Sequence, residues 1–156
     1  MVIDGAVQQV GLPASARGLA RHFRIGPTTR PYDDSSYVHH VEAFEGVGLR
    51  PYRPGHVAVR RLTDGTVVAT WIRRTRIDGD GWLGLDVPLG EEAERYLVRI
   101  GKGGVVLREA EVGVPRFAYG PAEQAGDGAS GPMTLEVAQV SARFGPGPFE
   151  RIAFDV

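Results

Sequence analysis

The stretch that decides the fold is TVVATWIRRTR, residues 66–76. Its apolar residues Val67, Ala69 and Trp71 share one face at a period of two, which is typical of a half-buried β-strand. Other short segments with the same alternation lie after Arg50, separated by glycine-rich turns. The seven expected strands are His56–Leu62, Thr66–Arg76, Arg95–Gly101, Val105–Val112, Arg116–Tyr119, Met133–Arg143 and Arg151–Val156. Seven short strands in roughly 100 residues predict an all-β fold, an antiparallel β-sandwich.

Two turns and one core follow from this pattern. Thr63-Asp64-Gly65 and Lys102-Gly103-Gly104 place glycine where a tight hairpin needs a positive φ. Trp71 has apolar partners at even spacing and is expected in the core. The other inward-facing residues expected are Val57, Val59, Val67, Ala69, Tyr96, Val98, Ile100, Phe117, Tyr119, Leu135, Val137, Ile152, Phe154 and Val156.

The composition is that of a globular chain without a strong electrostatic bias. Of 156 residues, 42% are hydrophobic and 24% are charged, and 22 glycines with 11 prolines favour turns over long helices. The net charge of -1 argues against nucleic acid as a partner. The absence of cysteine excludes disulfides and thiolate metal sites. No apolar run approaches the ~20 residues of a membrane span, so membrane insertion is not expected.

Residues 1–51 differ from residues 52–156. Two short strands are expected, at His22–Gly26 and Tyr37–Phe44, with the turn cluster Asp33–Ser36 between them. A lone strand pair is marginal in water. We therefore expect a small β/coil segment, the end of a preceding domain, packed on the sandwich. Pro51–Gly55 is expected to be the linker, because its two prolines cannot sit in a central strand.

Three motifs resemble the fibronectin type III family. In chain order they are Val67-x-Ala69-x-Trp71, Tyr96-x-Val98-x-Ile100, and Leu135-x-Val137 followed by Ala142-x-x-Gly145. The resemblance implies a sandwich in which Trp71 and Tyr96 pack in the core. The chain departs from the family where Met133 or Leu135 stands at the position of a tyrosine that forms a corner hydrogen bond. The insert Ile77–Glu94 is also longer than the family's usual connection.

A second resemblance covers nearly the whole chain. Its central stretches are WIRRTRIDGDGW (71–82) and VPLGEEAERY (87–96), preceded by RIGP (24–27), RPYDD (30–34) and GVGLRPY (46–52). They resemble the C-terminal region of gene transfer agent and phage tail baseplate proteins, a family of host-specificity tail proteins with a TIM-barrel-like domain upstream. No hydrolytic role transfers, because the barrel is not in this chain, and we do not expect an enzyme.

This second resemblance implies a virion component. The chain would be a structural and interaction module of a tail tip or baseplate, with other tail proteins as partners. It would be assembled in the cytoplasm and released with the particle. Contact with the recipient cell surface is a further role that the resemblance implies. The alternative is a carbohydrate-binding β-sandwich module that recognises cell-surface glycan.

The residues expected to contact a partner or glycan are Tyr52, Arg73, Arg74, Arg76 and Trp82. The arginines, together with the Arg60-Arg61 pair on the neighbouring strand, could bind phosphate, sulfated glycan or an acidic partner through paired hydrogen bonds. The alternative is an exposed face balanced by nearby acidic residues. An exposed tryptophan can stack on a sugar or anchor an interface, or it can cap the end of the sandwich.

Metal, cofactor and catalytic sites are not expected. Asp78 and Asp80, helped by Glu91–Glu94, could offer oxygens to calcium, but the EF-hand pattern fails and a solvated turn is the alternative. His39 and His40 are adjacent and point to opposite faces, and His22 and His56 have no local companions. No Gly-x-Ser-x-Gly motif is present. The glycine-rich stretch around Ser130 lacks the lysine of a phosphate loop and reads as a flexible connection.

Overall fold

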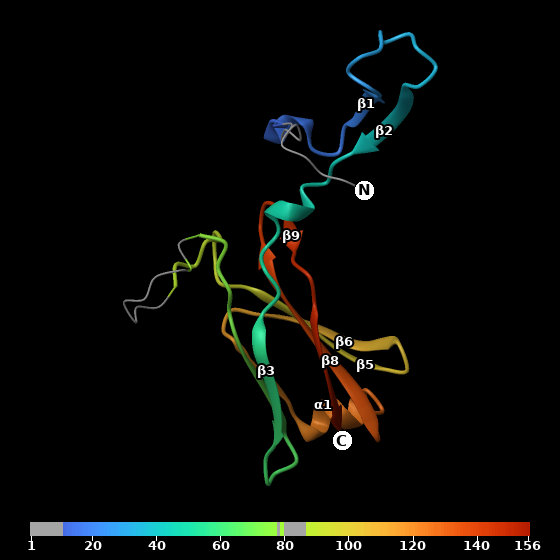
Figure 1. Cartoon of the computed structure of the whole chain (residues 1–156). Helices are drawn as coiled ribbons and strands as arrows, with labels where there is room; N and C mark the ends of the chain where they lie inside the picture. The colour runs from blue at the N-terminus through green and yellow to red at the C-terminus, as the bar shows by residue number, and fades with distance from the viewer. Residues whose placement is uncertain (1–10, 78, 80–86) are drawn as a thin grey trace. The chain divides into compact units, whose positions relative to one another are not determined.

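The structure, a computed structural model, describes residues 11–77, 79 and 87–156 (Figure 1). The chain divides into two units between Val47 and Gly48, a few residues before the expected division after residue 51. The difference comes from Pro51 and Pro54, whose side chains are both buried. The carbonyl oxygen of Pro51 lies so close to Gly147 that a Cβ there would overlap it. The expected linker therefore belongs to the second unit.

In its described residues, 11–47, the first unit contains one antiparallel hairpin. Strand β1 (Ala20–Ile25) pairs with β2 (Val38–Ala43), with Ala20 opposite Ala43 and Ile25 opposite Val38. A short 3-10 helix, η1 (Ala14–Ala16), precedes it, and η2 (Val47–Leu49) follows. Both strands expected here are confirmed. All the residues of β2 are exposed, so the part of this unit that the structure describes has little interior.

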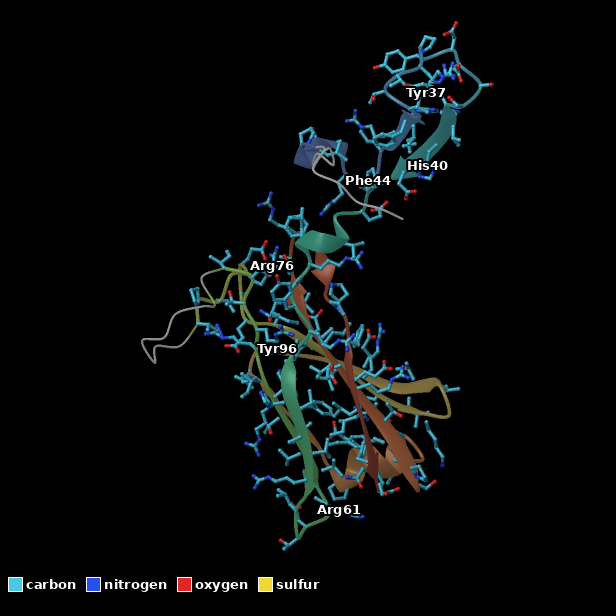
Figure 2. The ribbon with its side chains drawn as sticks, in the orientation of Figure 1. Tyr37, His40, Phe44, Arg61, Arg76 and Tyr96 are labelled. Carbon is cyan, nitrogen blue, oxygen red and sulfur yellow. The ribbon has the colours of Figure 1, made fainter. Side chains whose placement is uncertain are left out.

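The hairpin loop is closed by its own polar groups. The Tyr37 hydroxyl lies 3.0 and 3.2 Å from the carbonyl oxygens of Pro27 and Arg30 (Figure 2). The backbone N–H of Ser36 donates to Oδ1 of Asp34 at 2.9 Å, as expected of the turn cluster. Hydrogen bonding to the Ser36 side chain, and then to its backbone N–H, lowers the pKa of Asp34, since both favour the charged carboxylate.

The second unit is an antiparallel sandwich of two sheets. One sheet has the order β3-β4-β7 and the other β10-β8-β5-β6, with the short β9 paired to β8. Every pairing is antiparallel, so the predicted all-β sandwich is confirmed. The strands are β3 (Gly55–Arg61), β4 (Val67–Ile72), β5 (Tyr96–Lys102), β6 (Val105–Val112), β7 (Arg116–Tyr119), β8 (Pro132–Ser141), β9 (Gly145–Pro146) and β10 (Glu150–Asp155).

The core lies between the inner faces of these sheets. Trp71 from β4 and Tyr96 from β5 pack edge to face with ring centroids 5.2 Å apart, and both are buried. The core face predicted from the period of two is confirmed: on β4 Trp71 is 4% exposed, whereas its neighbour Ile72 is 58% exposed. Val68, on the other face of β4, is buried as well. Fully burying one such side chain contributes about 1.5–3 kcal/mol. The other buried members of the core are Val67, Ala69, Val98, Ile100, Phe117, Tyr119, Met133, Leu135, Val137 and Phe154.

One strand boundary and one connection differ from expectation. Strand β4 ends at Ile72 and not at Arg76, because Ile72 pairs with Gly55, the first residue of β3. Residues 73–76 therefore have no strand to pair with. The stretch before Ser130 also contains a short helix, α1 (Pro121–Gly126). Pro121 occupies its first turn, and the Glu123 carboxylate accepts a hydrogen bond from the Gly120 N–H at 2.9 Å.

The missing family tyrosine is replaced by a different residue. Met133 and Leu135 fill the expected positions on β8 and are buried. Tyr119, at the end of β7, instead donates its hydroxyl proton to Oδ2 of Asp127, just after α1, at 2.9 Å. The connection between β7 and β8 is thus held by a tyrosine from the preceding strand.

Candidate functional site

A basic and aromatic surface forms at one end of the sandwich. Since β4 ends opposite the start of β3, the residues that follow Ile72 emerge beside those that precede Gly55. The loop between β8 and β9 contributes to the same cluster, because Arg76 lies over the Phe144 ring at 6.0 Å. We call this surface the basic end; its residues are Tyr52, Arg73, Arg74, Arg76, Arg143 and Phe144.

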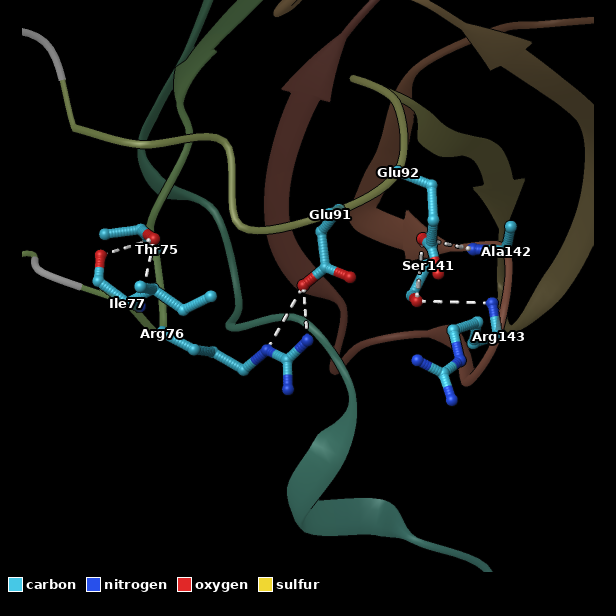
Figure 3. Close-up of polar contacts among 8 residues, drawn as sticks. All are labelled: Thr75, Arg76, Ile77, Glu91, Glu92, Ser141, Ala142 and Arg143. Carbon is cyan, nitrogen blue, oxygen red and sulfur yellow. Dashed lines mark hydrogen bonds and ion pairs between the residues drawn. The ribbon is translucent and has the colours of Figure 1, made fainter. Parts of the chain in front are cut away.

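Arg76 is held by a nearly buried carboxylate. Its Nε and Nη2 donate to Oε1 of Glu91 at 3.1 and 2.8 Å (Figure 3). The side chain of Glu91 is 4% exposed. Separating such a pair would leave a buried charge unpaired, so both side chains are held in place. Arg76 is therefore engaged in fixing residues 87–94 to the end of β4.

Arg73 anchors the same segment, and Thr75 closes a local turn with Ile77. Nη2 of Arg73 donates to the carbonyl oxygen of Val87 at 2.5 Å. The hydroxyl of Thr75 contacts both the backbone N–H and the carbonyl of Ile77, at 3.1 and 3.0 Å (Figure 3). Two of the three predicted arginines thus hold loop backbone in place.

Arg74 and Tyr52 form an exposed pair in the basic end. The Arg74 guanidinium carbon lies 5.5 Å from the centre of the Tyr52 ring. The Arg74 side chain is exposed, and Tyr52 is 48% exposed. A cation over an aromatic ring contributes about 0.5–1 kcal/mol at an exposed site. This contact aligns a guanidinium and a phenol side by side at the surface.

Glu92 secures the other loop of the basic end. Its Oε2 accepts hydrogen bonds from the Ser141 hydroxyl at 3.2 Å and the Ala142 N–H at 3.1 Å (Figure 3). Backbone hydrogen bonds, first from its own N–H and then from Ala142, hold the pKa of Glu92 below its usual range. Arg143 follows directly and lies over the Phe144 ring at 5.4 Å.

The basic cluster predicted with Arg60 and Arg61 is divided in the structure. Arg60 and Arg61 pair with Val68 and Val67, at the start of β4, whereas residues 73–76 follow its end. Six strand residues separate the two groups by roughly 20 Å. Figure 2 shows Arg61 and Arg76 toward opposite ends of the second unit. The prediction of one shared arginine face is therefore wrong for Arg60 and Arg61.

Some predicted residues lie outside the described part of the chain. Trp82, Asp78 and Asp80 are among them. The three glutamates considered as additional calcium ligands serve separate contacts: Glu91 binds Arg76, Glu92 binds Ser141 and Ala142, and Glu94 accepts from the Tyr96 hydroxyl at 2.8 Å. Within the described residues, no three histidine or acidic side chains converge as a metal ion would need.

Sequence reasoning missed two arrangements of ionisable residues. His22 was expected to lack a companion, yet its Nδ1 lies 3.0 Å from Nε2 of His39, because β1 and β2 pair in antiparallel register. The second is the corner at α1, where Arg108 donates to both carboxylate oxygens of Asp127, at 2.7 and 3.0 Å. The contact between His22 and His39 could have been predicted only from the register of β1 and β2.

The corner shifts the ionisation of its members. Hydrogen bonding to Arg108, and then to Tyr119, lowers the pKa of Asp127. Burial first, and then its hydrogen bond to the Asp127 carboxylate, raises the pKa of Tyr119 to about 12. Both shifts favour the protonation states that hold the corner together.

A pocket on the outer face of the four-stranded sheet carries paired charges. Arg99, Thr134, Glu136 and Arg151 are among its lining residues. Arg99 donates to Glu109 at 2.7 Å, and Arg151 forms an ion pair with Glu136. Within the described residues, no helix has the length and apolar character that crossing a bilayer requires.

Comparisons with known proteins returned structural similarity only. No protein-family model and no curated protein matches the chain. Among solved structures, it is similar to domains d3–d4 of the rat CD45 extracellular region, with 11% identity and a TM-score of 0.49 over 100% of this chain and 74% of that one.

Two single-domain structures are similar to a smaller part of the chain. An FN3tt mutant matches 67% of this chain and 94% of its own, with 15% identity and a TM-score of 0.46. The FN5 domain of Drosophila Lar matches 68% of this chain and 96% of its own, with 14% identity and a TM-score of 0.40. These neighbours are fibronectin type III-like domains.

Proposed function

We propose that the chain is a structural and interaction module of a phage-like tail tip or baseplate of the gene transfer agent type. The residue resemblance described above is the source of the particle assignment. The observation that carries the interaction role is the basic end, where Arg74 and Tyr52 are exposed side by side. In this proposal the module is not catalytic, and its partners are neighbouring tail proteins.

The construction of the basic end suits a contact surface. Arg73 and Arg76 immobilise the backbone on either side of Arg74 through Val87 and Glu91. A side chain presented from a fixed backbone loses less conformational entropy on binding. Arginine and tyrosine are also the residues most enriched in the centres of protein interfaces. The surface fits a partner with exposed carboxylates, which a guanidinium binds with paired hydrogen bonds.

The alternative function, binding of a cell-surface glycan, rests on the same two residues. The partly exposed Tyr52 ring could stack on a sugar, and Arg74 could bind a sulfate or uronate group. In this alternative, the module would bind glycan where the tail tip of the particle contacts the recipient cell surface.

The test uses particles purified from cells that express the full-length protein. Cells carry Arg74→Glu or, as a matched control at the opposite end of the sandwich, Arg61→Glu. We expect Arg74→Glu to reduce the amount of the protein in purified particles and the control to leave it unchanged. Particles that never contain this protein would refute the assignment.

A glycan array distinguishes the alternative. The glycan-binding module would be favoured if the purified chain binds acidic glycans and Tyr52→Ala abolishes this binding. Incorporation into particles that depends on Arg74, without glycan binding, would favour the structural role.

A further inference from the structure

Two histidines meet on one face of the hairpin in the first unit. His22 on β1 pairs with Val41, and His39 on β2 pairs with Arg24, so the two histidines are diagonal neighbours on the same face. Nδ1 of His22 lies 3.0 Å from Nε2 of His39, and the rings stack with centroids 5.2 Å apart and planes inclined by 15°. Both side chains are exposed.

We propose that His22 and His39 form a two-imidazole binding site for a divalent first-row transition-metal ion. A metal–nitrogen bond is about 2.0–2.1 Å long, so two nitrogens bound at neighbouring positions are roughly 2.9–3.4 Å apart. The 3.0 Å separation of Nδ1 and Nε2 already matches that spacing. The two strands can supply this spacing without backbone movement, but both rings must turn about their side-chain bonds. In the hydrogen bond the two nitrogens face each other, whereas metal binding needs both lone pairs to point at one ion.

The proton balance of binding is simple. Without metal, one imidazole donates its N–H to the lone pair of the other. Metal binding needs both facing nitrogens as lone-pair donors, so that proton moves to the other nitrogen of the same ring. Both rings remain neutral, and His22 Nε2 and His39 Nδ1 then carry the protons. The remaining coordination positions face solvent and are filled by water or by a group from a partner.

The charges around the pair determine the strength of binding. Arg24 lies directly opposite His39 on the same face, and the other positions of that face in the two strands are Ala20, Val41 and Ala43. The face therefore supplies no carboxylate and one opposing cation. Such a site favours ions with strong intrinsic affinity for imidazole nitrogen, in the order Cu²⁺ above Ni²⁺ and Zn²⁺.

A control for the site lies one residue away. His40 is on the opposite face of β2, where its Nε2 lies 3.3 Å from Glu42 (Figure 2). It has the same chemistry and similar exposure but does not face His22. Binding that depends on His22 and His39 and not on His40 would identify this pair, as opposed to histidine content, as the site.

The test is titration of the tag-free full-length chain with CuCl₂ and with ZnCl₂, followed by calorimetry and electron paramagnetic resonance of the copper form. We expect one ion per chain with two bound nitrogens. His22→Gln and His39→Gln should each weaken binding by more than an order of magnitude, whereas His40→Gln should leave it unchanged. Equal binding by the parent and His22→Gln, or equal loss in His40→Gln, would overturn the proposal.

Two further variants are expected to bind metal more tightly, and they test the proposal even if a histidine variant unfolds the hairpin. Arg24→Gln removes the opposing cation and should tighten binding of both ions. Val41→His places a third imidazole opposite His22 and should tighten binding further, with three nitrogens in the copper spectrum. Unchanged affinity in both variants would place any bound metal elsewhere.

Discussion

The hairpin and the sandwich are built from the same kind of strand but differ in what those strands bury. In β2 all six residues are exposed, whereas in β4 four of six are buried. Both pair antiparallel, β2 with β1 in unbroken register and β4 with β3 with one register shift between Gly55 and Ala58. Alternating sequence therefore suffices to form a strand pair, but burial in this chain comes from a second sheet packed on the first.

Polar contacts show the same contrast. In the hairpin, the His40–Glu42 pair is about half exposed at both side chains, and the His22–His39 contact is exposed. In the sandwich, Glu91 is nearly buried beside Arg76. Removing one partner is expected to cost more in the sandwich, because it leaves a buried charge unpaired there, whereas in the hairpin water solvates the remaining group.

The largest expected difference is between two aromatic truncations. Trp71→Ala removes a core ring and should lower the free energy of unfolding of the sandwich by about 3–5 kcal/mol. Phe23→Ala, which loses an edge contact with Phe44 in the hairpin, should leave the sandwich transition in place. Urea denaturation followed by circular dichroism measures both. Equal losses would mean that the hairpin shares the core of the sandwich.

The second test compares ion pairs. Arg76→Gln leaves the buried Glu91 carboxylate without its guanidinium and should cost about 1–3 kcal/mol. His40→Gln removes an exposed pair and should cost less than about 1 kcal/mol. Thermal unfolding of both variants against the parent gives the comparison. If the Arg76→Gln variant unfolds at the same temperature as the parent, residues 87–94 are not fixed through this pair.

The third test concerns a close approach of backbone. Gly147→Ala would force a Cβ into the carbonyl oxygen of Pro51 and should cost about 1–3 kcal/mol through backbone displacement. Gly126→Ala is the control, because a Cβ there meets nothing within 4 Å. In the hairpin, Gly26→Ala would displace the Tyr37 ring and should change only local signals in an NMR spectrum. A stable Gly147→Ala variant would contradict the packing of Pro51 on the second unit.

The fourth test compares two tyrosine hydroxyls. Tyr119→Phe loses the hydrogen bond to Asp127 and should cost about 1 kcal/mol, measured by urea denaturation. Tyr37→Phe loses exposed contacts to loop carbonyls and should leave the sandwich transition unchanged. A destabilised sandwich in Tyr37→Phe would show that the hairpin loop stabilises it.

The smallest expected effect is a dependence on pH. The pKa of Tyr119 is raised to about 12, so the folded state favours the neutral phenol. Its contribution is complete below the unfolded pKa near 10 and is lost as pH rises from about 10 to 12. The pKa of Asp127 is lowered by Arg108, so its contribution is complete above about pH 4 and is lost on acidification through the folded pKa.

Variants separate these two contributions. Tyr119→Phe should reduce the alkaline slope of stability against pH and keep the acidic one. Asp127→Asn should reduce the acidic slope. An alkaline slope that is identical in Tyr119→Phe and the parent would show that this hydroxyl does not carry it.

Much of the fold could be predicted because its signals are local. Alternation along each strand determines its faces, so it predicts Trp71 and Tyr96 in the core without knowledge of their contact. Turn glycines were equally readable: Gly65, Gly103 and Gly104 all have positive φ, as expected. The helix α1 was missed although Pro121 and Glu123 mark its start, because the glycines that follow suggested a flexible connection.

The sequence by itself determined where most of the strands lie, which side of each faces the core and where the two tight hairpins turn. Only the tertiary structure decided which strands are neighbours. That choice separated Arg61 from Arg76, brought His22 to His39 and paired Arg76 with Glu91, because strand register and loop placement depend on contacts between residues distant in sequence. Such contacts depend on what each face packs against, and no short stretch of the chain carries that information.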